Sequence, residues 1–190
     1  INSVISTIKK SGLLKNNNLI LIDYRVDKNQ SLLVEADFLE LTQVFYNLIE
    51  NGIKYGNSNS DILIKIDQMK TNELTVSVIN EGEGIPEKYI DRVTERFFRV
   101  DKARSRKIGG TGLGLAIVKH ILIKHRAELS IRSDQNKQTI FSIAFPVLKN
   151  WKIISYLILM SMNEILLADD EPNQIELMKF NLEKNGFLVK

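Results

Sequence analysis

The sequence contains no cysteine among its 190 residues. Disulfide frameworks, zinc sites built from cysteines and thiol catalysis are therefore excluded. The chain also lacks an apolar run long enough to cross a bilayer. The run that we tested, WKIISYLILM at Trp151–Met160, is only about half of the roughly 20 residues that a membrane-spanning helix needs. We therefore expect no membrane insertion of this chain.

Neither charge nor length points to an unusual class of protein. The formal net charge is only +3, which is weak evidence for a polyanionic partner, and we expect no nucleic-acid binding. The hydrophobic content of 44% is ordinary for a globular protein with a sizeable core. The chain starts at Ile1 and no signal peptide follows, so we expect a piece of a longer protein. Its length suggests one domain with an extension, or two small domains.

Hydrophobic periodicity predicts a mixture of helices and strands. Apolar residues recur at helical spacing from Leu39 to Ile53, with Asp37 as the expected N-cap, and again from Leu115 to His125. A short helix is expected within 85–93. Strands are expected at 19–24, 31–35, 62–66, 74–79, 129–133 and 139–145. They should form three hairpin-like pairs of consecutive strands, the first of them joined by a polar turn. This arrangement predicts an α/β (α+β) two-layer sandwich, in which a mixed, mostly antiparallel sheet has helices on one face.

Glycine is scarce, and its distribution is uneven. Four of the ten glycines, Gly109, Gly110, Gly112 and Gly114, immediately precede the second helical run. Glycine lets a backbone approach a ligand closely, and a helix N-terminus attracts anions such as phosphate. The hydroxyl of Thr111 could assist. The glycines alone leave open whether this segment binds phosphate or is a hinge before a core helix.

Two further segments carry candidate binding groups. In NLIENGIKY, Asn47, Asn51 and Lys54 share one helix face. Amide oxygens suit Mg²⁺ and lysine suits phosphate, although a solvated helix face would show the same pattern. In VINEGEGIP, Asn80 ends a strand before two closely spaced glycines. This second segment is either an ordinary turn or a loop on which a flat base lies while Asn80 reads its edge.

The order and spacing of these segments closely resemble the ATP-binding catalytic domain of bacterial sensor histidine kinases. NLIENGIKY resembles the N box of that family, NEGEGIP its first glycine box, ERFFRVD its phenylalanine box and GGTGLGLAIVKH its second glycine box. The resemblance covers about residues 19–146. The segment RFFRVDKARSR is most similar to the phosphate-sensing branch of the family.

This resemblance implies a function, its cofactors and its partners. The domain would bind ATP with Mg²⁺ in a histidine-kinase/gyrase-type ATP-binding fold, and would transfer the γ-phosphoryl group to a histidine on a separate dimerisation domain. A response regulator would be the next partner. The location would be cytoplasmic, with the parent kinase at the inner face of the cell membrane.

The resemblance also assigns roles to individual residues. Glu50 and Asn51 would be catalytic, Asn47 and Asn51 would hold Mg²⁺ with the phosphates, and Phe97 would pack at the base of a lid together with Phe98. Arg99, Arg104 or Arg106 would meet phosphate. The nucleotide-binding positions implied are Asn47, Asn51, Lys54, Tyr55, Asn80, Gly82, Gly84, Ile85, Phe97, Arg99, Gly110, Thr111, Gly112, Leu113 and Gly114.

Two positions depart from the family pattern. The family usually has aspartate where this chain has Asn80, to accept a hydrogen bond from the adenine amino group, and asparagine retains a carbonyl acceptor. Arg126-Ala127 replaces a frequent Gly-Gly pair, and the turn at 134–138 lacks glycine. We expect these glycine losses to affect folding details more than nucleotide binding.

The expected domain organisation follows from the same resemblance. Residues 1–18 would be the tail of a helical dimerisation domain or a linker, 19–148 the catalytic domain and 149–162 a linker. Residues 163–190 resemble the start of a response-regulator receiver domain, in which Asp169 and Asp170 match an Mg²⁺-binding acidic pair. His120 and His125 are in no phosphoacceptor context and are interpreted as structural.

Two alternatives to the kinase interpretation remain. A gyrase- or chaperone-type ATPase would need a general-base glutamate four residues before the metal-binding asparagine. Asn47 holds that position, and an amide cannot take a proton from water, which favours the kinase. The other alternative is a non-catalytic remnant that binds nucleotide or a partner kinase.

Overall fold

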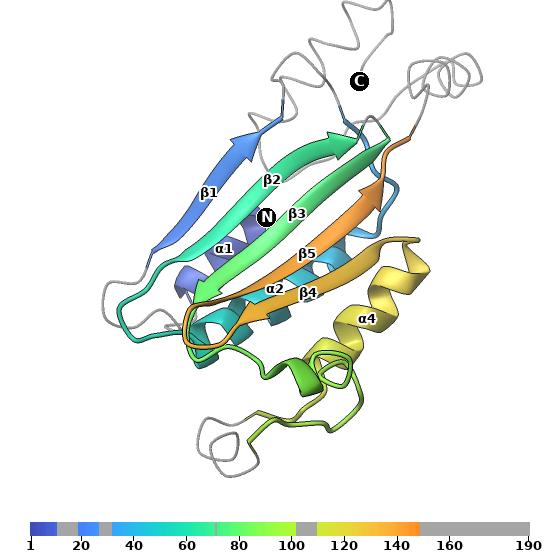
Figure 1. The fold of residues 1–190 in the computed structure, drawn as a ribbon. Coiled ribbons are helices and arrows are strands. Elements are labelled where there is room, and N and C mark those ends of the chain that lie inside the picture. The colour runs from blue at the N-terminus through green and yellow to red at the C-terminus, as the bar shows by residue number, and fades with distance from the viewer. Residues whose placement is uncertain (11–18, 27–31, 71, 102–109, 149–190) are drawn as a thin grey trace, which may run out of the picture. The chain divides into compact units, whose positions relative to one another are not determined.

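The computed structural model describes residues 1–10, 19–26, 32–70, 72–101 and 110–148. Residues 1–148 form one compact unit, with a five-stranded sheet in the order β1-β2-β3-β5-β4. β1 and β2 pair in parallel, and the other neighbours are antiparallel. The strands are β1 (Ile20–Arg25), β2 (Ile62–Lys70), β3 (Glu73–Glu81), β4 (Glu128–Asp134) and β5 (Gln138–Pro146). Three helices cover one face of the sheet, which confirms the predicted fold class (Figure 1): α1 (Asn2–Lys10), α2 (Phe38–Tyr55) and α4 (Gly114–Lys124).

The core lies between the helices and one face of the sheet. Alternate residues of β5, from Thr139 to Phe145, are buried, as the period of two requires for a strand with one covered face. Phe145 meets Phe45 of α2 with ring centroids 6.5 Å apart. The helices contribute Val4, Ile5, Ile8, Val44, Phe45, Leu48, Ile49, Val118, Ile121 and Leu122.

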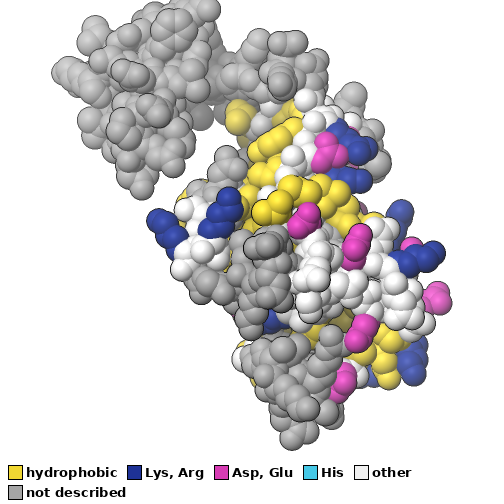
Figure 2. All heavy atoms as spheres, turned by 90° about the vertical axis from the view of Figure 1, so that its left-hand side faces the viewer, with side chains coloured by type: hydrophobic (Ala, Val, Ile, Leu, Met, Phe, Trp, Pro, Cys, Tyr) yellow, Lys and Arg dark blue, Asp and Glu magenta, His cyan; other side chains and the backbone are white. Residues whose placement is uncertain are grey.

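β1 forms one edge of the sheet, and none of its residues is fully buried. Leu21 and Tyr24 are 44% and 59% exposed, and Leu19 just before the strand is 57% exposed. Figure 2, which views the molecule from this side, shows hydrophobic side chains gathered in a band with acidic and basic side chains around them. The parallel pairing of β1 with β2 differs from the expected hairpin between 19–24 and 31–35.

Two other expectations differ from the structure. Residues 32–35 form no strand, and the Leu33 carbonyl accepts a hydrogen bond from the Leu148 N–H at 2.9 Å. The expected short helix within 85–93 is a 3₁₀ turn, η1 (Glu87–Tyr89). The first ten residues belong to the segment expected as a tail of a dimerisation domain or a linker, and they pack into the same compact unit as the sheet. The origin of this segment stays a prediction.

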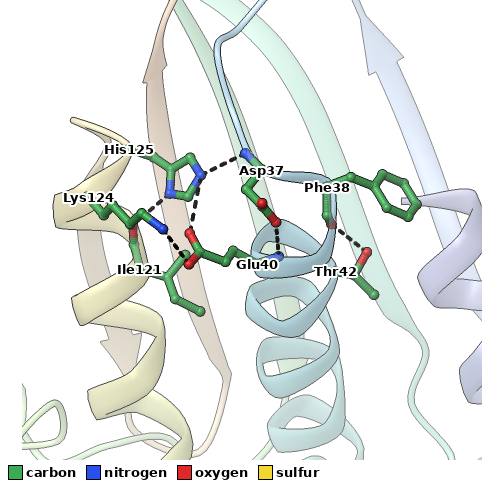
Figure 3. Close-up of polar contacts among 7 residues, drawn as sticks. All are labelled: Asp37, Phe38, Glu40, Thr42, Ile121, Lys124 and His125. Carbon is green, nitrogen blue, oxygen red and sulfur yellow. Dashed lines mark hydrogen bonds and ion pairs between the residues drawn. The ribbon is translucent and has the colours of Figure 1, made fainter.

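The start of α2 and the end of α4 are joined by a hydrogen-bonded cluster (Figure 3). The Asp37 carboxyl accepts the Glu40 N–H at 2.9 Å, which confirms Asp37 as the N-cap. The Asp37 N–H donates to His125 Nε2 at 2.9 Å, while His125 Nδ1 lies 2.8 Å from the Ile121 carbonyl oxygen. The His125 proton is therefore on Nδ1. Lys124 Nζ contacts Glu40 Oε1 at 2.6 Å. His125 thus has a structural role, whereas His120 is exposed on α4.

Asparagine at position 37 should reduce the acid sensitivity of the fold. The hydrogen bond from Glu40 N–H lowers the pKa of the Asp37 carboxyl below its ordinary value. The ionised carboxylate therefore stabilises the fold above about pH 4, and this contribution is lost as the pH falls through the lowered pKa. Asp37→Asn keeps a capping oxygen, so we expect a smaller drop in Tm on acidification than in the wild type. Asp91→Asn, at an exposed turn, is the matched control, and its Tm should drop on acidification as much as that of the wild type. Equal drops in Tm in all three proteins would contradict the role of Asp37 in acid sensitivity.

Glycine at position 126 should stabilise the end of α4. Arg126 has φ 54°, the left-handed region that arginine adopts only with strain. Its N–H donates to the Ile123 carbonyl at 3.1 Å and the Ala127 N–H to the Leu122 carbonyl at 2.9 Å, which together form a Schellman motif. We expect Arg126→Gly to raise the free energy of unfolding by about 0.5–1 kcal/mol in urea titrations. Arg126→Ala, which retains the strained φ, should bring no such gain.

Candidate functional site

A cavity of about 510 Å³ opens between α2, the start of α4 and the loop that follows β3. Most of the site residues expected from the sequence line its wall: Asn47, Glu50, Asn51, Lys54, Tyr55, Asn80, Gly84, Ile85, Arg99, Gly110, Thr111, Gly112, Leu113 and Gly114. Phe98, expected with Phe97 at the base of the lid, also lines the wall. The wall further includes residues that the sequence interpretation did not include in the site: Glu83, Val93, Val100, Asp101, Leu115, Ile117, Thr139 and Phe141. The structure thus brings together segments that are far apart in the sequence.

One face of α2 forms a polar wall of the cavity. Asn47, Asn51 and Lys54 lie on this face, as their spacing predicts. Lys54 Nζ lies 3.0 Å from Glu50 Oε1, and both side chains are 23% exposed. This half-buried ion pair holds the ammonium group at the cavity wall. The pair therefore fixes the position of a positive charge beside the Asn47–Asn51 side of α2.

The N-terminus of α4 faces the same cavity with uncapped backbone groups. Leu113 is the N-cap residue and provides no side-chain hydrogen bond, and its own N–H reaches Thr111 Oγ1 only at 3.4 Å. The first-turn N–H groups and the positive end of the helix dipole are thus available to an anion. A Cβ at Gly114 would lie 3.2 Å from Asn47 Oδ1, so this helix end lies close to the polar face of α2.

The phenylalanine pair splits between solvent and cavity. Phe98 lines the cavity, and its ring lies 5.7 Å from Tyr89 and 4.5 Å from the Arg92 guanidinium carbon. Phe97, expected in the site, has φ 65°, is 70% exposed and lies outside the cavity wall. It acts through its backbone, because its N–H donates to the Gly112 carbonyl at 2.8 Å. Gly112 has φ 74°, and a Cβ there would lie 2.9 Å from the Phe97 backbone.

The first glycine segment is fixed by the β4–β5 hairpin. Gly84 has φ 77°, and a Cβ at this position would lie 2.8 Å from the Asp134 carbonyl oxygen. Ile85 N–H donates to Ser133 Oγ at 2.8 Å, which positions the loop beside the cavity. Asn136 takes the left-handed conformation with φ 58°, so the hairpin turns without glycine.

Gly82 lies behind this wall rather than on it. A Cβ at Gly82 would lie 2.7 Å from the Tyr55 carbonyl oxygen, so the residue lets the end of α2 approach β3. Its N–H donates to the Lys137 carbonyl at 3.2 Å. Gly82 is therefore a packing residue in this structure.

Two buried polar residues form the inner end of the cavity. Asn80 and Thr139 are each 5% exposed and face each other as register partners of β3 and β5. Phe141, Ile117 and Val93 add apolar surface beside them. A pocket with apolar walls and a few polar groups at its base suits a flat, hydrogen-bonding ring.

Some expected site residues lie outside the described part of the chain. These are Arg104 and Arg106, and the acidic pair Asp169 and Asp170. Within the described residues, no three histidine, aspartate or glutamate side chains gather in a way that could hold a metal ion. The oxygen atoms that the cavity wall offers to a cation are the amide oxygens of Asn47 and Asn51 and single carboxylates such as that of Glu50.

Comparison with known proteins identifies the family. The sequence profile described as "Histidine kinase-, DNA gyrase B-, and HSP90-like ATPase" matches residues 36–149, and the chain belongs to this family. The sensor histidine kinase WalK of Bacillus subtilis (strain 168) is 42% identical over 119 residues, which cover 62% of this chain and 20% of WalK. The phosphate regulon sensor protein PhoR of Pseudomonas aeruginosa is 40% identical over 122 residues, covering 63% of this chain and 27% of PhoR.

Solved structures agree with this result. The catalytic domain of the histidine kinase ThkA is 27% identical with a TM-score of 0.62, covering 76% of this chain and 88% of that domain. The mycobacterial sensor histidine kinase MprB, at 23% identity and a TM-score of 0.62, covers 77% of this chain and 93% of the solved one, and shows the same fold.

The chain is thus homologous to the catalytic domains of sensor histidine kinases, and it spans only about a fifth to a quarter of the two curated relatives. The family implies the use of ATP. The comparisons do not favour the self-contained ATPase or the remnant. None of the helices in the described ranges has the length and apolarity to span a bilayer.

Proposed function

We propose that this domain binds Mg-ATP and transfers the γ-phosphoryl group to a histidine on a separate dimerisation domain. The observation that carries the proposal is the cavity itself, in which the uncapped start of α4 faces the Asn47–Asn51 side of α2. Phosphoryl transfer depends mainly on positioning and on stabilising negative charge. A helix N-terminus, a lysine and two side-chain amides line the same cavity, and these groups can both position the phosphates and stabilise their negative charge.

The roles of the residues follow from this arrangement. The amide oxygens of Asn47 and Asn51 would hold Mg²⁺ together with the phosphates, because Mg²⁺ prefers oxygen ligands. Lys54 would contribute a positive charge, held in place by its ion pair with Glu50. Arg99 is the described arginine of the predicted set that lines the cavity.

The other side of the cavity suits the base of the nucleotide. The Asn80 and Thr139 polar groups and the Ile85 backbone lie there, next to apolar walls. The Mg²⁺ ion, when bound, would neutralise phosphate charge, and Glu50 would orient the groups around it. Asn47 rather than a glutamate precedes Asn51 by four residues, which supports a kinase over a water-activating ATPase.

The parent protein is proposed as a cytoplasmic-facing sensor kinase of the phosphate-sensor-like branch. Its partners would be the histidine-bearing dimerisation domain and a response regulator. Residues 163–190 are proposed as the start of a receiver domain with Asp169 and Asp170 as its acidic pair, and they lie outside the described residues.

A transfer assay tests the proposed function. The purified chain is incubated with radiolabelled ATP and Mg²⁺, alone and with a histidine-bearing dimerisation domain taken from a close relative. We expect no label on the chain alone, because His125 is hydrogen-bonded within the fold, and acid-labile, base-stable label on the added domain. Label on the chain alone at His120 or His125, or phosphate release to water without transfer, would contradict the proposal.

A further inference from the structure

Asn80 is held at the inner end of the cavity by backbone contacts. It is 5% exposed and lies beside two glycines of α2 and its C-terminal end. A Cβ at Gly52 would lie 3.4 Å from Asn80 Cβ, and a Cβ at Gly56 would lie 3.6 Å from Asn80 Nδ2. Both distances are those of ordinary van der Waals contact, so Asn80 packs against the end of α2. Its position is fixed by packing, whichever way the amide is turned.

The amide itself is only weakly fixed. Its recorded hydrogen bond runs from Nδ2 to the Glu81 carbonyl oxygen at 3.5 Å, the long limit for such a bond. The neighbouring hydroxyl of Thr139 is 2.8 Å from Ser133 Oγ, so it already has a partner. Turning the Asn80 amide by half a revolution about its last bond therefore costs one weak contact.

An amide that can turn matches two different purine edges. It presents a donor and an acceptor side by side. Adenine offers a 6-amino donor next to the N1 acceptor, whereas hypoxanthine and guanine offer a 6-oxo acceptor next to an N1–H donor. One amide orientation pairs with the first edge and the reversed orientation with the second. A carboxylate has acceptors only, so it accepts a bond from a 6-amino group and repels a 6-oxo group.

We propose that Asn80 makes this cavity a site for both 6-amino and 6-oxo purine nucleoside triphosphates. The inference rests on the proposed nucleotide-binding function and extends it to base selectivity. Asn80 is then a specificity-determining residue, because the acceptance of either base follows from its amide. A polar group at the inner end of a pocket discriminates strongly between two ligands only when one of them leaves it without a hydrogen bond. Neither a 6-amino nor a 6-oxo purine leaves the Asn80 amide unpaired.

Binding of ATP and ITP measures this selectivity, because the two ligands lack the 2-amino group and differ only at the 6-position and N1. Calorimetry in Mg²⁺ on the whole chain should give Kd values within about threefold of each other. Asn80→Asp should shift the preference to ATP by about tenfold or more, because its carboxylate repels the 6-oxo group. Asn57→Asp makes the same chemical change at an exposed asparagine outside the cavity wall. It is the matched control, and it should leave the ATP-to-ITP ratio of the wild type unchanged.

The outcomes separate the two proposals. Wild-type binding of ATP with ITP more than about tenfold weaker overturns the dual site and leaves the nucleotide-binding function intact. A folded Asn80→Asp variant with the wild-type ratio also overturns it. Binding of neither nucleotide refutes the proposed function itself. If Asn80→Asp does not fold, the test uses purine riboside triphosphate, which has no 6-substituent. The wild type should bind this ligand more weakly than ATP and ITP. Equal binding of all three nucleotides overturns the proposal.

Discussion

Alanine at position 51 is expected to weaken Mg-ATP binding by about 10- to 100-fold, because it removes an oxygen ligand for the cation at the centre of the site. Asn51 lies on the α2 face that lines the cavity, one turn after Asn47 and three residues before Lys54. The described residues offer no cluster of carboxylates that could hold the metal without this amide. The variant should fold normally, because the side chain faces the cavity rather than the core.

The metal dependence of the loss distinguishes a ligand from a packing residue. Isothermal calorimetry should show a large difference between wild type and Asn51→Ala in Mg²⁺, and a much smaller difference when EDTA replaces Mg²⁺. Asn57→Ala, an exposed asparagine just after α2, is the matched control and should bind like the wild type. Unchanged binding by Asn51→Ala in Mg²⁺ would refute the role of Asn51 in holding the metal.

The polar face of α2 shows what a sequence can predict about this site. Helical spacing of four and three residues places Asn47, Asn51 and Lys54 on one side, and the structure has them on one cavity wall. The N-cap at Asp37 and the β2–β3 and β4–β5 pairs follow equally from local signals. Such features depend on neighbours in the sequence, so local patterns are sufficient to predict them.

Contacts between segments that are far apart in the chain could not be predicted from local sequence patterns. Thr139 enters the site because it is the register partner of Asn80, and no local pattern fixes the register between strands so distant in the chain. Phe97 and Phe98 were both expected at the base of a lid, but only Phe98 lines the cavity, and Phe97 has φ 65°. β1 pairs with β2 rather than with residues 31–35, because the choice of strand partner depends on tertiary packing.

The two missing glycines show how the fold tolerates departures from a family pattern. Arg126 and Asn136 both take positive φ where glycine would be unstrained. Asparagine adopts this region readily, and the Schellman hydrogen bonds hold arginine in it. Both residues lie outside the cavity wall, so the strain affects stability rather than the binding groups.

Alanine at position 8 is expected to destabilise the whole domain by about 2–4 kcal/mol, a large fraction of the stability of a typical domain. Ile8 is fully buried, at 0% exposed, and Val4 and Ile5 beside it on α1 are 2% and 8% exposed. All three belong to the core cluster that includes residues of α2 and the sheet. Truncating Ile8 therefore leaves a cavity in the common core rather than at a frayed end.

Urea unfolding measures this effect, with Ser6→Ala as the matched control, since Ser6 is an exposed α1 residue and its truncation should change stability little. If residues 1–10 did not contribute to the stability of the domain, Ile8→Ala would unfold at the same urea concentration as Ser6→Ala. A single cooperative transition at lower urea would instead show that α1 is part of the catalytic domain. In that case deletion of α1 should lower both the nucleotide affinity and the free energy of unfolding. The reason is that α1 contacts α2, which carries the polar face of the cavity.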